Sequence, residues 1–313
     1  MHEVVTLGEC MALLCPEEPV TLEQAKTFSL DIAGAESNVA IGLSRLGHSV
    51  QFISRVGDDP FGRRIRATLD AEGVDTSCLL IDQVAPTGVF FREWLADGVR
   101  RVFYYRNGSA ASHLVPEDAQ PDSFTGARIL HVTGITPALS ESCAATVKHA
   151  IELAHAAGCL VSLDPNYRAK LWDAPIARKT LLPLMARADV LLLGHEDASA
   201  LFETDDDERI LEQGARFGAQ VVVLKRAERG ACAWTQTTRG EVPAEVVAAV
   251  IDPVGAGDGF DAGFLAGWLR GDSLDTALRL GAYIGAQAVA TRGDYAGYPR
   301  LAHRRKYDSL NNK

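Results

Sequence analysis

The residues best suited to chemistry lie together in residues 252–260, which have the sequence DPVGAGDGF. The apolar run at 246–251 predicts a strand before this stretch, and the small residues at 260–269 predict a helix after it. Because the first N–H groups of a helix lack partners within it, a strand, a glycine-containing turn and a helix start form an anion site. Gly255 and Gly257 would let the backbone approach a phosphate closely.

Asp258 is the unusual member of this stretch, because a carboxylate beside an anion site repels the anion unless it has a task. We expect it to accept the proton of a hydroxyl group that attacks a phosphoryl group, and the helix start to favour its ionised, weakly basic form. The amides of Gly255, Ala256 and Gly257 would then stabilise charge on the transferred group. A helix cap is the alternative role for Asp258, and the stretch by itself leaves both open.

Composition bounds the class of protein that carries this stretch. The 313 residues are 47% apolar and 23% charged, which is typical of a soluble enzyme with one large α/β domain or two small ones. A net charge of −10 argues against an extended nucleic-acid or membrane surface. The six cysteines lack metal-site spacing, and no apolar run approaches the ~20 residues that span a bilayer, so we expect a cytoplasmic protein with reduced thiols.

Alternating strand and helix patterns predict a doubly wound, mostly parallel sheet flanked by helices. A helix after Gly34 is expected to be capped by Ser37 or Asn38 and to end at Gly47. The predicted strands lie at 4–7, 50–57, 127–132, 159–163, 189–193 and 220–224, and further helices at 58–72, 141–156, 176–186, 209–217 and 274–291.

Two aromatic runs, 89–95 and 102–106, interrupt this alternation around Ala96-Asp97-Gly98, a hairpin turn signal. We expect strands drawn from about 10–32 and 87–106 to form a small β-lid, and a hairpin at the edge of the main sheet is the alternative. Since no long linker or repeat is present, residues 1–313 are interpreted as a single domain with this lid.

Two separate stretches together resemble the signatures of the ribokinase-like (PfkB) sugar kinases. Residues 33–38 (AGAESN), with Gly47 and Gly57, resemble the N-terminal signature, and residues 252–258 (DPVGAGD) resemble the C-terminal one. The likeness covers nearly the whole chain and favours the catalytic role of Asp258. It implies a ribokinase-like fold, ATP as phosphoryl donor with Mg²⁺, and allows a monovalent cation such as K⁺.

Within that family the chain looks most like 2-keto-3-deoxygluconate kinases, through residues 104–112, 134–139 and 164–168. The resemblance implies ATP-dependent phosphorylation of 2-keto-3-deoxy-D-gluconate at its terminal (O6) hydroxyl, giving 2-keto-3-deoxy-6-phosphogluconate and ADP. It places the sugar-acid site at Gly34, Tyr104, Tyr105, Arg106, Arg168 and Asp294. It places ATP contacts at Asn166, Tyr167, Arg168, Lys225, Arg226, Gly230, Gly255, Ala256 and Gly257.

The two arginines suit a sugar acid, because a guanidinium offers a fork of donors that matches a carboxylate. Arg106 ends the aromatic hairpin, and Arg168 follows the C-terminal end of a strand, where open α/β sheets bind ligands. A surface salt bridge is the ordinary alternative for each arginine.

Three residues depart from the family pattern and keep other functions open. Phe90 stands where related kinases can have tyrosine, Gly194 where the wider family has asparagine, and Ala282 where some relatives have asparagine near the adenine. A fructokinase, a 5-dehydro-2-deoxygluconokinase and a non-catalytic sugar-binding relative therefore remain alternatives, as does the galactonate-derived epimer as substrate. We also expect a homo-oligomer formed through the lid.

Overall fold

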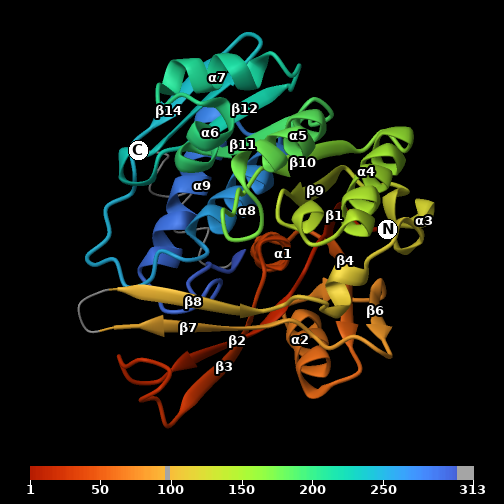
Figure 1. Cartoon of the computed structure of the whole chain (residues 1–313). Coiled ribbons are helices and arrows are strands. Elements are labelled where there is room, and N and C mark those ends of the chain that lie inside the picture. Colours follow the sequence, from red (N-terminus) through yellow and green to blue (C-terminus); the bar gives the residue numbers. More distant parts are fainter. Residues whose placement is uncertain (96–98, 302–313) are drawn as a thin grey trace.

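The computed structural model describes residues 1–95 and 99–301, and its main feature is a ten-stranded sheet (Figure 1). The strand order is β14-β13-β12-β11-β10-β9-β1-β4-β5, with β6 also paired to β4. Pairing is parallel except where β13 joins β12 and β14, so the predicted mostly parallel sheet is confirmed. The strands are β1 (Val4–Leu7), β4 (Val50–Gly57), β5 (Val74–Asp75), β6 (Leu79–Asp82), β9 (Ile129–Thr133), β10 (Leu160–Asp164), β11 (Val190–Gly194), β12 (Val221–Lys225), β13 (Ala231–Thr235) and β14 (Arg239–Val242).

Helices cover both faces of this sheet, which explains why its central strands are almost entirely apolar. Side chains alternate along β1, so that Val4 packs into one core and Val5 into the other. The first core lies against α1, α2, α8 and α9, and the second against α3 to α7. The helices are α1 (Ala35–Arg45), α2 (Pro60–Ala71), α3 (Pro121–Phe124), α4 (Glu141–Ala156), α5 (Ala174–Met185), α6 (His195–Phe202), α7 (Asp207–Ala215), α8 (Ala256–Arg270) and α9 (Leu274–Val289).

A second, four-stranded sheet has the order β3-β2-β7-β8 and is called the small sheet below. Its strands are β2 (Met11–Pro16), β3 (Phe28–Ala33), β7 (Val89–Trp94) and β8 (Arg100–Tyr105). The aromatic hairpin thus pairs with strands from the 10–32 region and does not extend the main sheet. Figure 1 shows the small sheet standing apart from the helix-covered sheet. The turn signal Ala96-Asp97-Gly98 lies outside the described residues.

Two local predictions are wrong. Residues 246–251 do not form a strand, because this segment is solvent-exposed, with Val246 at 97% exposure, and the preceding strand β14 already ends at Val242. Ser37 and Asn38 do not cap α1, which begins at Ala35 with Gly34 at its cap position. Both side chains are instead buried within the first turns of the helix, and their hydrogen bonds serve other groups.

The parallel strands bring their C-terminal ends to one edge of the main sheet, which is where such sheets place their ligands. Glu9 follows β1, Asp164 ends β10, Gly194 ends β11 and Lys225 ends β12. Short segments after these strands therefore converge beside the start of α8. Within the described part of the chain, no helix has both the length and the apolar character that a membrane crossing requires.

Candidate active site

The glycine turn, defined here as residues 252–257, leads directly into α8. Gly255 has φ +81°, and a Cβ added to it would lie 1.9 Å from the carbonyl oxygen of Asp294, so both the conformation and the packing require glycine. A Cβ at Gly257 would meet only the Lys225 ammonium, 3.8 Å away. The first N–H groups of α8 therefore face a space with a positive charge at its edge, which suits a phosphate.

Asp258 lies in the first turn of α8 and is half-buried. The amide Nδ2 of Asn38 donates a hydrogen bond of 2.8 Å to its Oδ2. Burial raises the pKa of Asp258 to about 6, although Asn38 and the positive charges of Arg168 and Lys225 oppose the rise. The expectation of a weakly basic carboxylate is therefore wrong, because desolvation outweighs the helix start. A carboxylate with this pKa is the better proton acceptor near neutral pH.

Lys225 bridges two buried carboxylates at the same edge. Its Nζ donates to Oδ2 of Asp164 at 2.9 Å and to Oδ1 of Asp261 at 2.8 Å. Burial alone would lower the pKa of Lys225, but the two carboxylates raise it, so the ammonium stays charged. Burial raises the pKa of Asp261, whereas Lys225 overcomes burial at Asp164 and lowers its pKa. Asp261 lies one helical turn beyond Asp258, and this pairing fixes the ammonium beside the glycine turn.

Three residues that were predicted to contact ATP follow β10, and they differ in burial and in their hydrogen bonds. Asn166 is buried at φ +38°, and its side-chain Oδ1 has no hydrogen-bond partner among the described residues. Tyr167 packs on the second core and donates from its hydroxyl to the carbonyl oxygen of Trp172. Arg168 is exposed, and its guanidinium forms no hydrogen bond or ion pair with a described residue, yet its charge lowers the pKa of Asp258. Arg168 is thus available to a ligand near Asp258.

Arg226 and Gly230 have structural explanations that need no nucleotide. The Arg226 guanidinium donates to Oε1 of Glu241 at 2.6 Å and to Oδ2 of Asp207 at 3.3 Å. Gly230 has φ +83°, and a Cβ there would lie 2.1 Å from the carbonyl oxygen of Val242. Both residues therefore stabilise the β12–β13 connection and its contact with β14.

Three of the predicted acceptor residues lie around Glu9, a buried carboxylate that the sequence analysis did not single out. Arg106 forms an ion pair with Glu9, and its guanidinium carbon lies 5.6 Å from the centre of the Tyr104 ring. A Cβ added to Gly34 would lie 2.1 Å from the carbonyl oxygen of Glu9. Tyr104 in turn stacks on Phe90 with ring centres 5.5 Å apart. Gly34, Tyr104 and Arg106 thus lie together.

Tyr105 does not join this group. Successive residues of a strand point to opposite faces, so Tyr104 and Tyr105 cannot line the same pocket. Tyr105 is 67% exposed and packs edge-on against Phe91, whereas Tyr104 packs against Phe90. The strand period corrects the placement of Tyr105 in the sugar-acid site.

Asp294 is buried beside the glycine turn, but its carboxylate is already engaged. Nη1 of Arg92 donates to its Oδ1 at 2.6 Å. Burial raises the pKa of Asp294, and Arg92 opposes this rise. Contact of Asp294 with a substrate would therefore have to share the carboxylate with Arg92.

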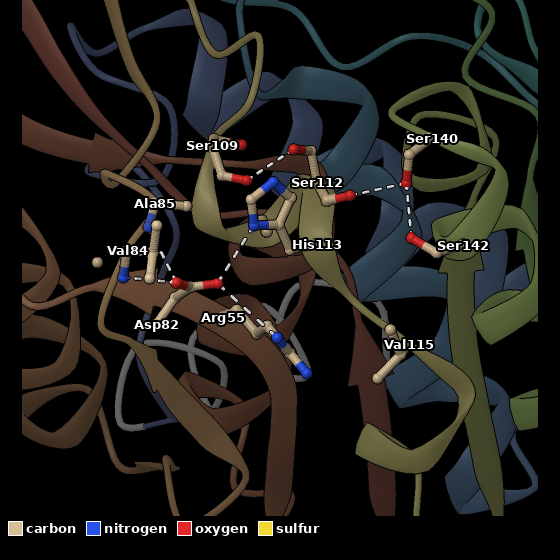
Figure 2. A network of polar contacts seen from close by, with 12 residues as sticks. Arg55, Asp82, Val84, Ala85, Ser109, Ser112, His113, Val115, Ser140 and Ser142 are labelled. Atoms are coloured by element: carbon tan, nitrogen blue, oxygen red, sulfur yellow. Dashed lines mark hydrogen bonds and ion pairs between the residues drawn. The ribbon is translucent and has the colours of Figure 1, made fainter.

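A network of short polar contacts anchors the segment that follows Arg106 (Figure 2). Ser109 donates from Oγ to Oε1 of Glu9 at 2.5 Å, and its carbonyl oxygen accepts from Oγ of Ser112 at 2.7 Å. The carbonyl oxygen of Ser112 accepts from Oγ of Ser140 at 2.7 Å, and Asp82 pairs with His113 at 3.3 Å. These bonds fix the position of residues 109–113, which follow Arg106 and contact Glu9.

The sequence analysis named Asp258 and Lys225 but did not find the residues that bond to them. Asn38 and Asp261 bond to Asp258 and Lys225, and their spacing offered a signal, since Asp261 lies one turn after Asp258. Asp197 lies three residues after Gly194, one of the positions that depart from the family pattern, and burial raises the pKa of Asp197 to about 7. Its Oδ2 lies 3.2 Å from where a Cβ of residue 194 would stand.

Comparison with known proteins finds carbohydrate kinases over nearly the whole chain. A model of the pfkB family carbohydrate kinases matches residues 1–301. The 2-dehydro-3-deoxygluconokinase of Bacillus subtilis is 39% identical, over 95% of this chain and 92% of its own. The 2-dehydro-3-deoxygalactonokinase of Haloferax volcanii is 34% identical, over 94% of this chain and 93% of its own. A probable fructokinase of Arabidopsis thaliana is 34% identical over 82% of this chain and 76% of its own.

Solved structures agree with the fold. A PfkB protein of Polaromonas sp. JS666 is 38% identical, with a TM-score of 0.89 over 97% of this chain and 99% of its own. A candidate ribokinase II of E. coli, in complex with ATP and Mg²⁺, is 25% identical, with a TM-score of 0.92 over 99% and 100%. The predicted ribokinase-like fold class is thereby confirmed.

Proposed function

Because the chain belongs to the pfkB family of carbohydrate kinases, we propose that it transfers the γ-phosphoryl group of ATP to O6 of 2-keto-3-deoxy-D-gluconate. The observation that carries this proposal is the position of Asp258 in the first turn of α8, directly after the glycine turn and held by Asn38 at 2.8 Å, with its pKa raised to about 6. A general base with such a pKa is matched to the deprotonation of an alcohol during attack. The intact turn and base argue against a non-catalytic relative.

In the proposed reaction the terminal hydroxyl oxygen attacks the γ-phosphorus while its proton passes to Asp258. The bond from the γ-phosphorus to the bridging oxygen breaks, and ADP leaves with that oxygen. Because phosphoryl transfer is governed mainly by positioning and charge, the amides of Gly255, Ala256 and Gly257 and the Lys225 ammonium stabilise the transferred group. The protonated Asp258 then loses its proton to solvent after the product departs.

ATP and Mg²⁺ fit the residues that surround the turn. Asn166 presents a buried, unpartnered Oδ1, and Arg168 has no ion pair within the described chain. No cluster of three described acidic, histidine or cysteine side chains could hold a metal ion by itself. Mg²⁺ would therefore be held largely by the ATP phosphates and water, where it supplies positive charge to the phosphate oxygens. A monovalent cation such as K⁺ belongs to the proposal as an activator, tested by replacing K⁺ with Na⁺.

The acceptor class follows from the two arginines. Arg168 carries an unpaired guanidinium near Asp258, and Arg106 retains a buried Nε without a hydrogen-bond partner among the described residues. The hydroxyl oxygens of a neutral sugar could accept from these donors, but only the carboxylate of a sugar acid adds an opposite charge and a charge-assisted pair. The proposed acceptor contacts are Gly34, Tyr104, Arg106 and Arg168, and Asp294 belongs to them only if it shares its carboxylate with Arg92.

The small sheet is proposed to act as a lid on a single kinase domain that comprises residues 1–313. It brings Tyr104 and Arg106 to the acceptor side, and its closure would exclude water from the transferred phosphoryl group. Its outer strand β8 has an open edge with exposed Phe103 and Tyr105, at 40% and 67%. Such an edge suits pairing with a second copy, so we propose a homo-oligomer through the lid. The cytoplasm is the proposed location, in agreement with six free cysteines.

A coupled ADP-release assay over a panel of acceptors tests the proposal. The panel holds 2-keto-3-deoxygluconate, its galactonate-derived epimer, 5-dehydro-2-deoxygluconate, fructose and ribose. We expect the highest kcat/KM for 2-keto-3-deoxygluconate, with the neutral sugars lower by roughly tenfold or more, since each lost charged contact costs about 1.5–3 kcal/mol. A higher kcat/KM for fructose would replace the proposal with a fructokinase, and no ADP release with any acceptor would favour the non-catalytic alternative.

A further inference from the structure

Arg92 is a buried arginine in the middle of β7, with only 3% of its surface exposed. Its Nη1 donates to Oδ1 of Asp294 at 2.6 Å, and its Nη2 lies 3.0 Å from Oδ2 of Asp252. Both carboxylates are themselves buried, at 6% and 4% exposure. Buried charges need such partners, so one guanidinium from the small sheet joins two acidic residues that are distant in the sequence.

Both carboxylates belong to backbone segments that shape the glycine turn. Asp252 begins the turn, and its Oδ1 accepts a hydrogen bond of 3.2 Å from the N–H of Val254. The carbonyl oxygen of Asp294 packs against Gly255, where a Cβ would approach it to 1.9 Å. Arg92 therefore holds the entry of the turn and the segment packed on it in one geometry.

The same strand reaches the acceptor side of the site. Phe90 lies two residues before Arg92, so the two side chains share a face of β7, and Phe90 stacks on Tyr104. A second arginine of the hairpin, Arg100, places its Nε 3.6 Å from Oδ1 of Asp252 and bonds to the carbonyl oxygen of Ile251. The small sheet thus contacts the proposed acceptor residues through one part and the glycine turn through another.

We propose that Arg92 is a positioning residue that couples the docking of the small sheet to the phosphate-binding geometry of the glycine turn. When β7 is docked, its guanidinium fixes Asp252 and Asp294, and the turn presents its N–H groups to the phosphoryl group. An acceptor held by Tyr104 and Arg106 favours that docked sheet. The coupling rests on the proposed kinase activity and adds to it that phosphoryl transfer is efficient only with the acceptor in place.

The test uses the full-length protein, with whichever acceptor the wild type phosphorylates, so that an incorrect acceptor does not count against Arg92. Arg92→Gln removes the charge, and Arg92→Lys keeps the charge but cannot bridge two carboxylates in the geometry of a planar fork. Arg101→Gln is the matched control, since Arg101 lies in the same hairpin, is exposed and only reaches Glu93 at 3.8 Å. Thermal unfolding and circular dichroism establish that each variant is folded.

For Arg92→Lys we expect kcat to fall roughly tenfold or more, because misplacement of the turn by about 1 Å can cost 10²-fold. The KM for the acceptor should change less than kcat, and acceptor-independent ADP release should rise relative to phosphorylation. Arg101→Gln should match the wild type in each measurement. If Arg92→Gln does not fold, Arg92→Lys decides the matter. A folded Arg92→Lys with kcat within twofold of wild type and unchanged coupling overturns the proposal, even if its Tm is lower.

Discussion

The phosphate side and the acceptor side of the site are built in different ways. The phosphate side is mostly contiguous, since the glycine turn and Asp258 form one stretch, and distant residues such as Lys225 and Asn38 only support it. The acceptor side is assembled from separate segments, with Glu9 after β1, Gly34 before α1 and Arg106 after β8. One side relies on backbone geometry that any acceptor would share, and the other on side chains that can distinguish acceptors.

The positively charged side chains of the two sides also differ in how many partners hold them. Lys225 lies between two buried carboxylates, so its position is fixed before any ligand arrives. Arg106 has one carboxylate partner, Glu9, and stacks near Tyr104, while Arg168 has no ion pair to a described residue. The phosphate side is thus preorganised, whereas the acceptor side keeps donors for a ligand. Substitutions on the two sides should therefore have separable kinetic effects.

The largest effect is expected for Asp258→Asn, which should lower kcat by about 10²–10⁴-fold for every acceptor. The amide cannot accept the hydroxyl proton, but its oxygen can still accept the hydrogen bond from Asn38. Because the folded-state pKa of Asp258 is raised above its usual value, the ionised carboxylate destabilises the fold at neutral pH, so the variant should not have a lower Tm.

Steady-state kinetics with several acceptors and thermal unfolding measure this effect. Asp275→Asn is the matched control, since Asp275 lies in the first turn of the neighbouring helix α9 and is exposed. It should retain wild-type turnover. Activity of Asp258→Asn within tenfold of wild type would contradict the role of Asp258 as general base, and with it the description of the phosphate side.

The contrast between the two sides also explains what the sequence could predict. The glycine turn and the strand–helix alternation are local patterns, so the turn before a helix and the mostly parallel sheet were predicted correctly, while the roles of residues 252–258 stay predictions. The raised pKa of Asp258 depends on burial in the folded chain, and the opposing hydrogen bond comes from the distant Asn38, so local sequence does not report it. The strand expected at 246–251 failed because an apolar run needs a neighbouring strand, and this segment is exposed.

On the acceptor side, the sequence analysis named Tyr104 and Arg106, but it did not name Glu9, the ion-pair partner of Arg106. Its position after β1 was the available signal, since ligands bind at the C-terminal ends of parallel strands. Tyr105 could have been excluded from the sequence alone, because neighbouring strand residues alternate between faces. Pairings across long sequence distances thus account for most of what was missed.

A smaller and more selective effect is expected for Arg106→Gln. It should raise the KM for the sugar acid about 10- to 100-fold, since a hydrogen bond to a charged group contributes about 1.5–3 kcal/mol. The KM for ATP should stay within about twofold, because the phosphate side keeps its own charges. Initial rates with each substrate varied at saturation of the other would measure both constants.

Arg106→Gln also leaves the buried Glu9 without its ion-pair partner, which could disturb the segment by itself. The double variant Glu9→Gln with Arg106→Gln removes this unpaired charge. If the raised KM reflects lost contact with the sugar acid, the double variant retains it. Recovery of the wild-type KM in the double variant would show that Arg106 only neutralises Glu9, and would remove the distinction between the two sides.

The smallest effect is a shift in pH dependence that sharpens the description of the phosphate side. A base must be unprotonated to accept a proton, so kcat/KM should fall tenfold per pH unit below about 6, the pKa to which burial raises Asp258.

Asn38 donates to the ionised carboxylate and so lowers this pKa. Asn38→Ala should therefore move the acidic limb upward by roughly one pH unit, since that unit corresponds to about 1.4 kcal/mol. Ser37→Ala should leave the limb in place, because the Ser37 hydroxyl donates to the carbonyl oxygen of Gly34 and not to Asp258. A limb that stays at the same pH in Asn38→Ala would assign it to another carboxyl group, and Asp197, with its pKa near 7, would be the first to test by Asp197→Asn.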